Sequence, residues 1–383
     1  FALVKFVGSA QQDTKWHYVI SRNDKKEGPP IMKLQKLRAQ LQQENIDALL
    51  ITNAYNLRYM TGFTGTAGIA IISQNDAVFI TDFRYTEQAS EQIEGFRIVQ
   101  HTGTIQEEAA AQIAQMNVRA VGFEKNAMQY GTYELYKSVL KANFVPVSGL
   151  IEKIRLIKTP QELTIIKVAC EIADAAFTHI VDFIKPGKTE LDVSNELEFF
   201  MRKQGATSSS FDIIVASGLR SALPHGVATN KVIEKGELVT LDFGALYNGY
   251  ISDITRTVAV GDISDELKDI YDAVLQSQLL GVEKIGPNMT GIEADAVCRD
   301  YLISRGYGKA FGHSTGHGIG LEVHEQPGLS FRSDTVLVPG MCVTVEPGVY
   351  IPGVGGCRIE DDIYITETGN EILTHSTKEL IIL

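Results

Sequence analysis

The chain has 383 residues and a formal net charge of −12 at pH 7, and its composition is that of an ordinary globular protein. The acidic balance argues against a nucleic-acid or anionic-membrane surface, because such a surface needs clustered Lys and Arg. No apolar run reaches the ~18–20 residues of a membrane span, and the spacing of the four cysteines predicts neither a disulfide framework nor a thiolate zinc site. We therefore expect a cytoplasmic protein of about two or three domains, with no nucleic-acid or membrane partner.

Residues 1–31 differ from the chain that follows. They mix Gln, Lys, Asp and a lone Trp16 without clear periodicity, and they lack the apolar core and cleavage site of a signal peptide. Met32 then opens an amphipathic helix, M-K-L-Q-K-L-R-A-Q-L. We expect Met32 to be the natural start and residues 1–31 to be a non-native or disordered extension. A peptide from before Met32 in the mass spectrum of the native protein would contradict this expectation.

Residues 32–155 predict an α/β domain with helices packed on a mostly internal, mixed sheet. Helical stretches alternate with four short β-rich ones, which are I-D-A-L-L-I-T, G-I-A-I-I-S, A-V-F-I-T and R-A-V-G-F. The glycines in T-G-F-T-G-T-A-G match neither the dinucleotide nor the nucleotide-triphosphate fingerprint. We therefore expect turn glycines rather than a phosphate-binding loop.

A second domain is expected over residues 156–383. The segment I-E-K-I-R-L-I-K at residues 151–158 has the character of a strand or linker, and a helix follows it. Thr159 can cap this helix, Pro160 suits its first position and Glu162 completes a capping box. Apolar residues keep helical spacing until a K-P-G sequence ends the helix.

The second domain contains an internal repeat. Four residues that frame a helix recur 101 positions later, namely Pro186, Thr189, Leu191 and Gly205 as Pro287, Thr290, Ile292 and Gly306. The strand G-E-L-V-T-L-D, which ends at Asp242, resembles G-M-C-V-T-V-E, which ends at Glu346, and the segment ending at Asp253 matches the one ending at Glu360. The offsets drift, as expected of an old duplication with small insertions. Each half therefore offers two carboxylates at matching places.

The first pair of carboxylates is expected to lie on one face of a hairpin. The Asn-Gly dipeptide at 248–249 is a strong signal for a two-residue turn, and this turn places Asp253 opposite Gly244. Asp242 then lies two residues along on the same face. Such diagonal neighbours have Cα atoms ~7–8 Å apart, close enough for two carboxylates to share metal ions. The alternative, two solvated strand acids, is disfavoured by the apolar residues on either side.

The stretch from His313 to Glu325, H-S-T-G-H-G-I-G-L-E-V-H-E, packs three histidines and two glutamates into thirteen residues. Buried imidazoles need partners for their nitrogens, so this density favours a metal site over three unrelated histidines. A set of two Asp, two Glu and one His suits two adjacent divalent ions such as manganese, cobalt, iron or zinc. Such a pair, ~3.5–4 Å apart, generates a hydroxide at neutral pH, so the expected reaction is hydrolysis.

Three further residues have roles open to them. Arg358 lies on the same strand face as Glu360. His225 lies in the turn L-P-H-G, where it is either a surface histidine or part of the site. His324 is placed to donate to a developing oxyanion.

From about Met32 onward the chain resembles the proline-specific peptidases of the methionine aminopeptidase and creatinase superfamily. The stretch from His313 to Glu325 matches the family signature, and the predicted ligands fall in its order. The resemblance implies a creatinase-like N-terminal α/β domain and an α+β "pita-bread" catalytic domain with a pseudo-twofold repeat. It also implies a metal pair, with manganese expected first, held by Asp242, Asp253, His317, Glu346 and Glu360. Asp253 and Glu360 are the expected bridging carboxylates.

The same resemblance assigns roles to the other residues. His225, His324 and Glu346 are expected to act in catalysis, with Glu346 moving the proton of the attacking water, and His313 and Arg358 are expected to hold substrate. The N-terminal domain implies a homodimer. Because an X-Pro amide has no N–H, the pocket should recognise the proline ring by shape.

The leading hypothesis is an Xaa-Pro aminopeptidase that hydrolyses the bond between an N-terminal residue and proline. The nearest alternative is a strict Xaa-Pro dipeptidase, since substrate length depends on how loops and the first domain enclose the pocket. A non-catalytic binding protein on the same fold is a remote alternative, because such proteins usually lose metal ligands. A dinucleotide enzyme is weaker still, because no complete glycine fingerprint is present.

Overall fold

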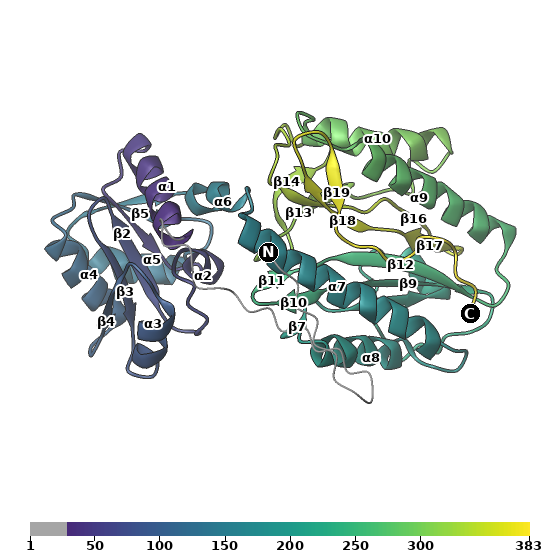
Figure 1. The fold of residues 1–383 in the computed structure, drawn as a ribbon, viewed down its shortest axis with the longest axis horizontal. Coiled ribbons are helices and arrows are strands. Elements are labelled where there is room, and N and C mark those ends of the chain that lie inside the picture. Colours follow the sequence, from purple (N-terminus) through teal and green to yellow (C-terminus); the bar gives the residue numbers. More distant parts are fainter. Residues whose placement is uncertain (1–28) are drawn as a thin grey trace, which may run out of the picture.

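The N-terminal domain is built on a six-stranded mixed sheet. The structure, a computed structural model, describes residues 29–383, and Figure 1 shows the two domains side by side. The strand order is β4-β3-β2-β1-β5-β6, and β1 pairs antiparallel with β2 but parallel with β5. The strands are β1 (Ala48–Ile51), β2 (Ile69–Ser73), β3 (Ala77–Thr81), β4 (Arg97–Gln100), β5 (Ala120–Glu124) and β6 (Asn143–Val147). The predicted α/β domain with a mixed sheet is confirmed.

Helices cover both faces of this sheet. They are α1 (Pro29–Gln43), α2 (Ala54–Thr61), α3 (Thr86–Gln92), α4 (Ile105–Gln115), α5 (Tyr130–Val139) and α6 (Leu150–Arg155). Leu49 packs with the residues of α1, whereas Leu50 packs with those of α4 and α5 on the opposite face. Strand β1 therefore has a continuous apolar sequence, because successive side chains point to two buried faces.

The structure differs from the sequence prediction at two places in this domain. The first helix begins at Pro29 rather than at Met32, and the expectation for residues 1–28 lies outside the described residues. The segment predicted as strand-like or linking is mostly the helix α6. Its buried residues Leu150, Ile151 and Ile154 have the i, i+1, i+4 spacing of one helical face, a pattern too short to separate from a strand by sequence alone.

The second domain contains the predicted repeat. The long helices α7 (Pro160–Phe183) and α9 (Asp265–Lys284) pack against α8 (Glu190–Lys203) and α10 (Gly291–Ser304). Thr189 and Thr290 cap the shorter helices with capping boxes, and Gly205 and Gly306 follow them with positive φ. The Thr159 capping box of α7 is also present, as predicted.

Strands from both halves lie between these helix pairs (Figure 1). They form the sheets β12-β9-β8, β11-β10-β7, β14-β13-β15-β18-β19 and β16-β17. Their bounds are β7 (Ser208–Ser209), β8 (Ile214–Ser217), β9 (Glu237–Phe243), β10 (Ala245–Tyr247), β11 (Tyr250–Ile251), β12 (Ile254–Val260), β13 (Gly316–Gly318), β14 (Glu325–Leu329), β15 (Cys342–Val345), β16 (Gly348–Ile351), β17 (Gly355–Arg358), β18 (Asp361–Ile365) and β19 (Asn370–Ile372). A short 3₁₀ helix, η1 (Gly218–Ala222), follows β8. Within residues 29–383, no helix is both long and apolar enough to cross a membrane.

The predicted hairpin has the predicted register. Tyr247 pairs with Tyr250 across the turn, and Ile254 pairs with Phe243, so Asp253 falls opposite Gly244. A Cβ at Gly244 would lie 1.7 Å from the backbone oxygen of Ser252, so this close approach needs glycine.

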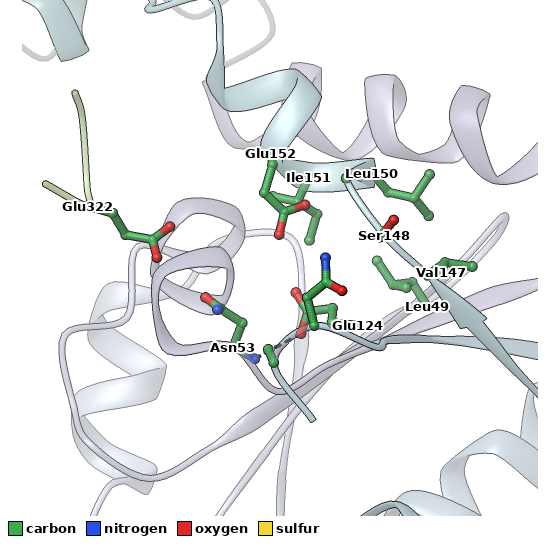
Figure 2. Close-up of a pocket in the computed structure, with 12 residues that line it drawn as sticks. Leu49, Asn53, Glu124, Val147, Ser148, Leu150, Ile151, Glu152 and Glu322 are labelled. Atoms are coloured by element: carbon green, nitrogen blue, oxygen red, sulfur yellow. Dashed lines mark hydrogen bonds between the residues drawn. The ribbon is translucent and has the colours of Figure 1, made fainter. Parts of the chain in front are cut away.

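The two domains meet at an ion-pair cluster, defined here as Arg155, Lys158, Glu322 and Glu325, of which all but the partly exposed Glu322 are buried. Arg155 donates to Glu322 Oε2 at 2.7 Å and also to Glu325, and Lys158 Nζ lies 3.1 Å from Glu325 Oε2. A cavity of about 250 Å³ adjoins the cluster. Figure 2 shows Glu322 of the second domain near Asn53, Glu124 and Glu152 of the N-terminal domain. The cluster thereby ties the N-terminal domain to the segment that begins with His313.

Candidate metal centre

Five sequence-predicted residues gather between the two halves of the second domain. Asp253, His317 and Glu360 each place one ligand atom within 4.8 Å of the other two. The Nε2 atom of His317 lies 3.3 Å from Glu346 Oε1 and 3.7 Å from Asp253 Oδ2. Asp242 is close enough for its charge to raise the pKa values of Asp253, Glu346 and Glu360. The structure therefore brings all five predicted ligands together.

The repeat explains how these side chains meet. Asp242 is the penultimate residue of β9 and Asp253 directly precedes β12, while Glu346 follows β15 and Glu360 directly precedes β18. Strands β9 and β12 pair antiparallel, as do β15 and β18, so each half presents its two acids at one end of a strand pair. His317 comes from β13, a strand of the second half with no equivalent histidine in the first.

Burial makes the ionised form of these acids energetically unfavourable. Burial and the charge of Glu360 raise the pKa of Asp253 well above its usual value, and burial and Glu346 do the same for Glu360. Burial raises the pKa of Glu346 to about 8, against the opposing effect of Arg358. Among the described residues, Asp242 Oδ1 and Asp253 Oδ1 are buried without a hydrogen-bond partner. Such carboxylates call for cations between them.

His317 supports the same conclusion. Its Nδ1 lies 3.1 Å from the carbonyl oxygen of Gly318, which can only accept, so Nδ1 carries the proton and Nε2 presents a lone pair to the carboxylates. Burial and the neighbouring His324 lower the pKa of His317 to about 4, so the ring is neutral at pH 7. Because Nε2 carries no proton, it cannot donate a hydrogen bond to these carboxylates. This arrangement fits a divalent metal ion, and the mixed carboxylate and imidazole set suits manganese, cobalt, iron or zinc.

Arg358, the predicted substrate contact, lies against Asp242. The side chain is only 4 % exposed, and its donors reach Asp242, the hydroxyl of Tyr350 and the carbonyl oxygen of Pro224. In this structure Arg358 is the counter-ion of Asp242. The sequence placed it correctly beside the acids, but its partners Asp242 and Pro224 come from distant segments.

The remaining histidines surround this cluster. His313 Nε2 lies 3.0 Å from the Tyr350 hydroxyl, and burial with the charge of Arg358 lowers its pKa to about 4. His324 is exposed, and its ring packs edge-on against His317 with centroids 4.4 Å apart. His225 is also exposed, on the loop that accepts a hydrogen bond from Arg358 at Pro224.

Sequence reasoning missed three residues of the site. Tyr350 joins His313 to Arg358, Thr255 donates to Glu360 Oε2 at 2.6 Å, and Asp362 accepts the backbone N–H of Asp253 at 2.8 Å. Thr255 and Asp362 each lie two residues after an acid and hence on the same strand face, a signal that could have pointed to them. Tyr350 has no comparable signal.

The titrating groups predict how pH affects the metal-free protein. The raised pKa of Glu346 gives a stabilising contribution that is complete below 4.5 and is lost as pH rises towards about 8. The lowered pKa of His317 acts oppositely, because its contribution is complete above 6.5 and is lost as pH falls through about 4. Of these two contributions, only that of the Glu346 carboxylate varies above pH 6.5. The Tm of chelated protein should therefore fall between pH 6.5 and 8. Calorimetry with and without added Mn²⁺ checks this, and a Tm that rises across this range in chelated protein contradicts it.

Comparisons with known proteins identify the family of this chain. The model of metallopeptidase family M24 matches residues 164–367, and that of the creatinase/prolidase N-terminal domain matches residues 33–157. An uncharacterized peptidase, YqhT of Bacillus subtilis, is 61 % identical over 92 % of this chain and 100 % of its own length.

Two solved structures are also similar. The Xaa-Pro dipeptidase from Bacillus anthracis has a TM-score of 0.92 and 62 % identity, and the match covers 92 % of this chain and 100 % of that one. The X-Pro aminopeptidase from Thermotoga maritima has a TM-score of 0.84 and 38 % identity, with 90 % of this chain and 100 % of that one covered. The expected fold, an N-terminal creatinase-type domain followed by a metallopeptidase catalytic domain, is thereby confirmed. The chain is an enzyme of metallopeptidase family M24 that carries a creatinase/prolidase N-terminal domain.

Proposed function

We propose that the protein is an Xaa-Pro dipeptidase that hydrolyses the bond between the two residues of an X-Pro substrate. The observation that carries the proposal is the cluster of Asp253, His317 and Glu360 with the buried Asp242 and the partly buried Glu346 beside it. The dipeptidase replaces the aminopeptidase as the leading hypothesis, because the similar structure at 62 % identity bears the name dipeptidase, whereas the one named aminopeptidase is 38 % identical. The aminopeptidase remains the second candidate.

In this proposal two divalent ions, expected to be Mn²⁺, are held by Asp242, Asp253, His317, Glu346 and Glu360. When bound, such ions supply a hydroxide nucleophile at neutral pH and stabilise the charge of an acyl-transfer transition state. The Nδ1–H of His317 donates to Gly318, which fixes the ring with its Nε2 lone pair towards the acids.

The other residues bind substrate and move protons. Glu346 takes the proton of the attacking water. Its pKa is about 8 without metal, and bound cations would lower it towards neutral pH. His324 is exposed beside His317 and donates to the developing oxyanion. His313, fixed by Tyr350, and His225 face the substrate. The proline ring, which has no N–H, is recognised by shape.

Substrate length tests the dipeptidase. A strict dipeptidase must bind the free carboxylate of proline, and in a tripeptide this group is an uncharged amide. We therefore expect Ala-Pro to be hydrolysed at least ~100-fold faster than Ala-Pro-Ala, measured as kcat/KM from released alanine. Equal or faster hydrolysis of Ala-Pro-Ala would establish the aminopeptidase instead.

Chelation tests the metal dependence. Dialysis against EDTA should abolish hydrolysis of Ala-Pro, and Mn²⁺ should restore it, with two ions bound per chain by elemental analysis. Full activity in a metal-free preparation would defeat the proposed mechanism.

A homodimer and a cytoplasmic location belong to the same proposal. All four cysteines are unpaired and buried, which suits a reducing compartment, and light scattering of the purified protein measures the oligomeric state.

A further inference from the structure

The two central acids of the site are tied to each other's half of the repeat. Asp253 and Glu360 occupy equivalent positions, and so do Thr255 and Asp362, two residues after them. The N–H of Glu360 donates to the carbonyl oxygen of Thr255 at 3.0 Å. In the reverse direction, the N–H of Asp253 donates to Asp362 Oδ2 at 2.8 Å. Each acid is thus held by the residue two positions after the other acid.

Thr255 fixes Glu360 by a second bond. Its hydroxyl donates to Glu360 Oε2 at 2.6 Å, and Arg358 Nε donates to the same hydroxyl at 3.1 Å. The threonine side chain is fully buried, so no water replaces these contacts. Both the backbone and the carboxylate of Glu360 are therefore positioned by one residue of the opposite half.

Asp362 is held rigidly for its contact with Asp253. It is fully buried in β18, its carbonyl oxygen accepts from Leu373 N at 2.8 Å, and its own N–H donates to Thr374 Oγ1 at 3.2 Å. Cys170 of α7 donates its Sγ–H to Asp362 Oδ2 at 3.4 Å. Asp253 lies between β11 and β12, so its buried N–H needs an acceptor from outside the hairpin, and Asp362 supplies it.

We propose that Thr255 and Asp362 are positioning residues that set the separation of the Asp253 and Glu360 carboxylates for a pair of metal ions. The proposal rests on the proposed function, in which these two acids bridge the ions. A pair of ions requires carboxylates held at a fixed distance, and residues that bond to metal ligands typically change metal affinity ~10–100-fold when replaced. The duplication provides these contacts in both directions, because each half of the repeat supplies the residue that holds the acid of the other half.

Thr255 gives the cleaner test. Thr255→Val removes the hydroxyl that bonds to Glu360 while it keeps the shape and the backbone, and Thr255→Ser keeps the hydroxyl. We expect T255V to bind the second Mn²⁺ ~10–100-fold more weakly and T255S to bind it as the wild type does. The matched control is Thr257→Val on the same strand, because the buried Thr257 hydroxyl bonds to the backbone of Arg358 and to no acid. T257V should lower Tm yet retain the affinity for both ions.

Asp362 is tested in parallel. Asp362→Ala removes the acceptor of the Asp253 N–H, whereas Asp362→Asn retains an acceptor oxygen at that place. We expect D362A to bind the second Mn²⁺ as weakly as T255V does and D362N to recover most of the affinity. Titration of apoprotein with Mn²⁺ gives affinity and stoichiometry, and EPR of the loaded protein distinguishes a coupled pair from a single ion, so neither readout depends on turnover.

Wild-type Mn²⁺ affinity in both T255V and D362A would overturn the proposal. It would also be overturned if T255S and D362N lost as much affinity as T255V and D362A, because the hydrogen bonds would then be irrelevant. If the wild-type protein bound no Mn²⁺ pair, or if an Asp253→Asn variant bound the pair as tightly as the wild type does, the proposed function itself would fail. The two failures are therefore distinguishable.

Discussion

Asp253→Asn should abolish hydrolysis of Ala-Pro and the binding of the Mn²⁺ pair. Asp253 is 4 % exposed, lies 3.7 Å from His317 Nε2 and is one of the three residues whose ligand atoms converge. An amide offers one neutral oxygen in place of a charged carboxylate. We expect kcat/KM to fall by more than ~100-fold, beyond the effect of residues that only touch the ligands. Steady-state kinetics together with metal analysis of the purified variant measure both losses.

Asp174→Asn is a suitable control for this substitution. Asp174 is an acid of the same domain, but its carboxylate accepts the backbone N–H groups of His375 and Ser376, at 2.7 Å each, and contacts no proposed ligand. This variant should lose some stability and keep both metal ions and activity. If D253N hydrolysed Ala-Pro at the wild-type rate, the metal mechanism would be wrong and a non-catalytic role for the site would be favoured.

The second large effect is expected at the ion-pair cluster between the domains. Arg155→Met should lower the free energy of unfolding by ~3–5 kcal/mol, the usual cost of removing one partner from a buried ion pair. Arg155 is 4 % exposed and donates to Asn56 Oδ1 at 2.8 Å as well as to Glu322 and Glu325. The substitution leaves Glu325 buried with Lys158 as its remaining cation. Urea denaturation followed by far-UV circular dichroism measures the change.

Lys167→Met provides the comparison. Lys167 pairs with Glu371 at 2.7 Å, but the side chains are 38 % and 47 % exposed, so solvent screens the pair. Its removal should cost less than ~1 kcal/mol. An R155M variant as stable as K167M would mean that the buried cluster contributes no more than a surface pair.

Much of the fold could be predicted from local patterns. The capping boxes at Thr159, Thr189 and Thr290 involve residues three positions apart, so the sequence displays both partners of each bond. The hairpin register is also local, because a two-residue turn fixes every pair that follows it. The limits of α6 were missed, because six residues carry too short an apolar pattern to separate a helix from a strand.

The sequence by itself determined the ligand types, the repeat and the position of Asp253 relative to Asp242, since each follows from composition, offset or turn geometry. Only the tertiary structure decided that Arg358 pairs with Asp242, that Arg155 anchors Glu325, and that Thr255 and Asp362 each hold an acid of the opposite half. These contacts join residues more than 100 positions apart in the chain. No local spacing encodes them, because they form only when segments far apart in the chain pack against one another.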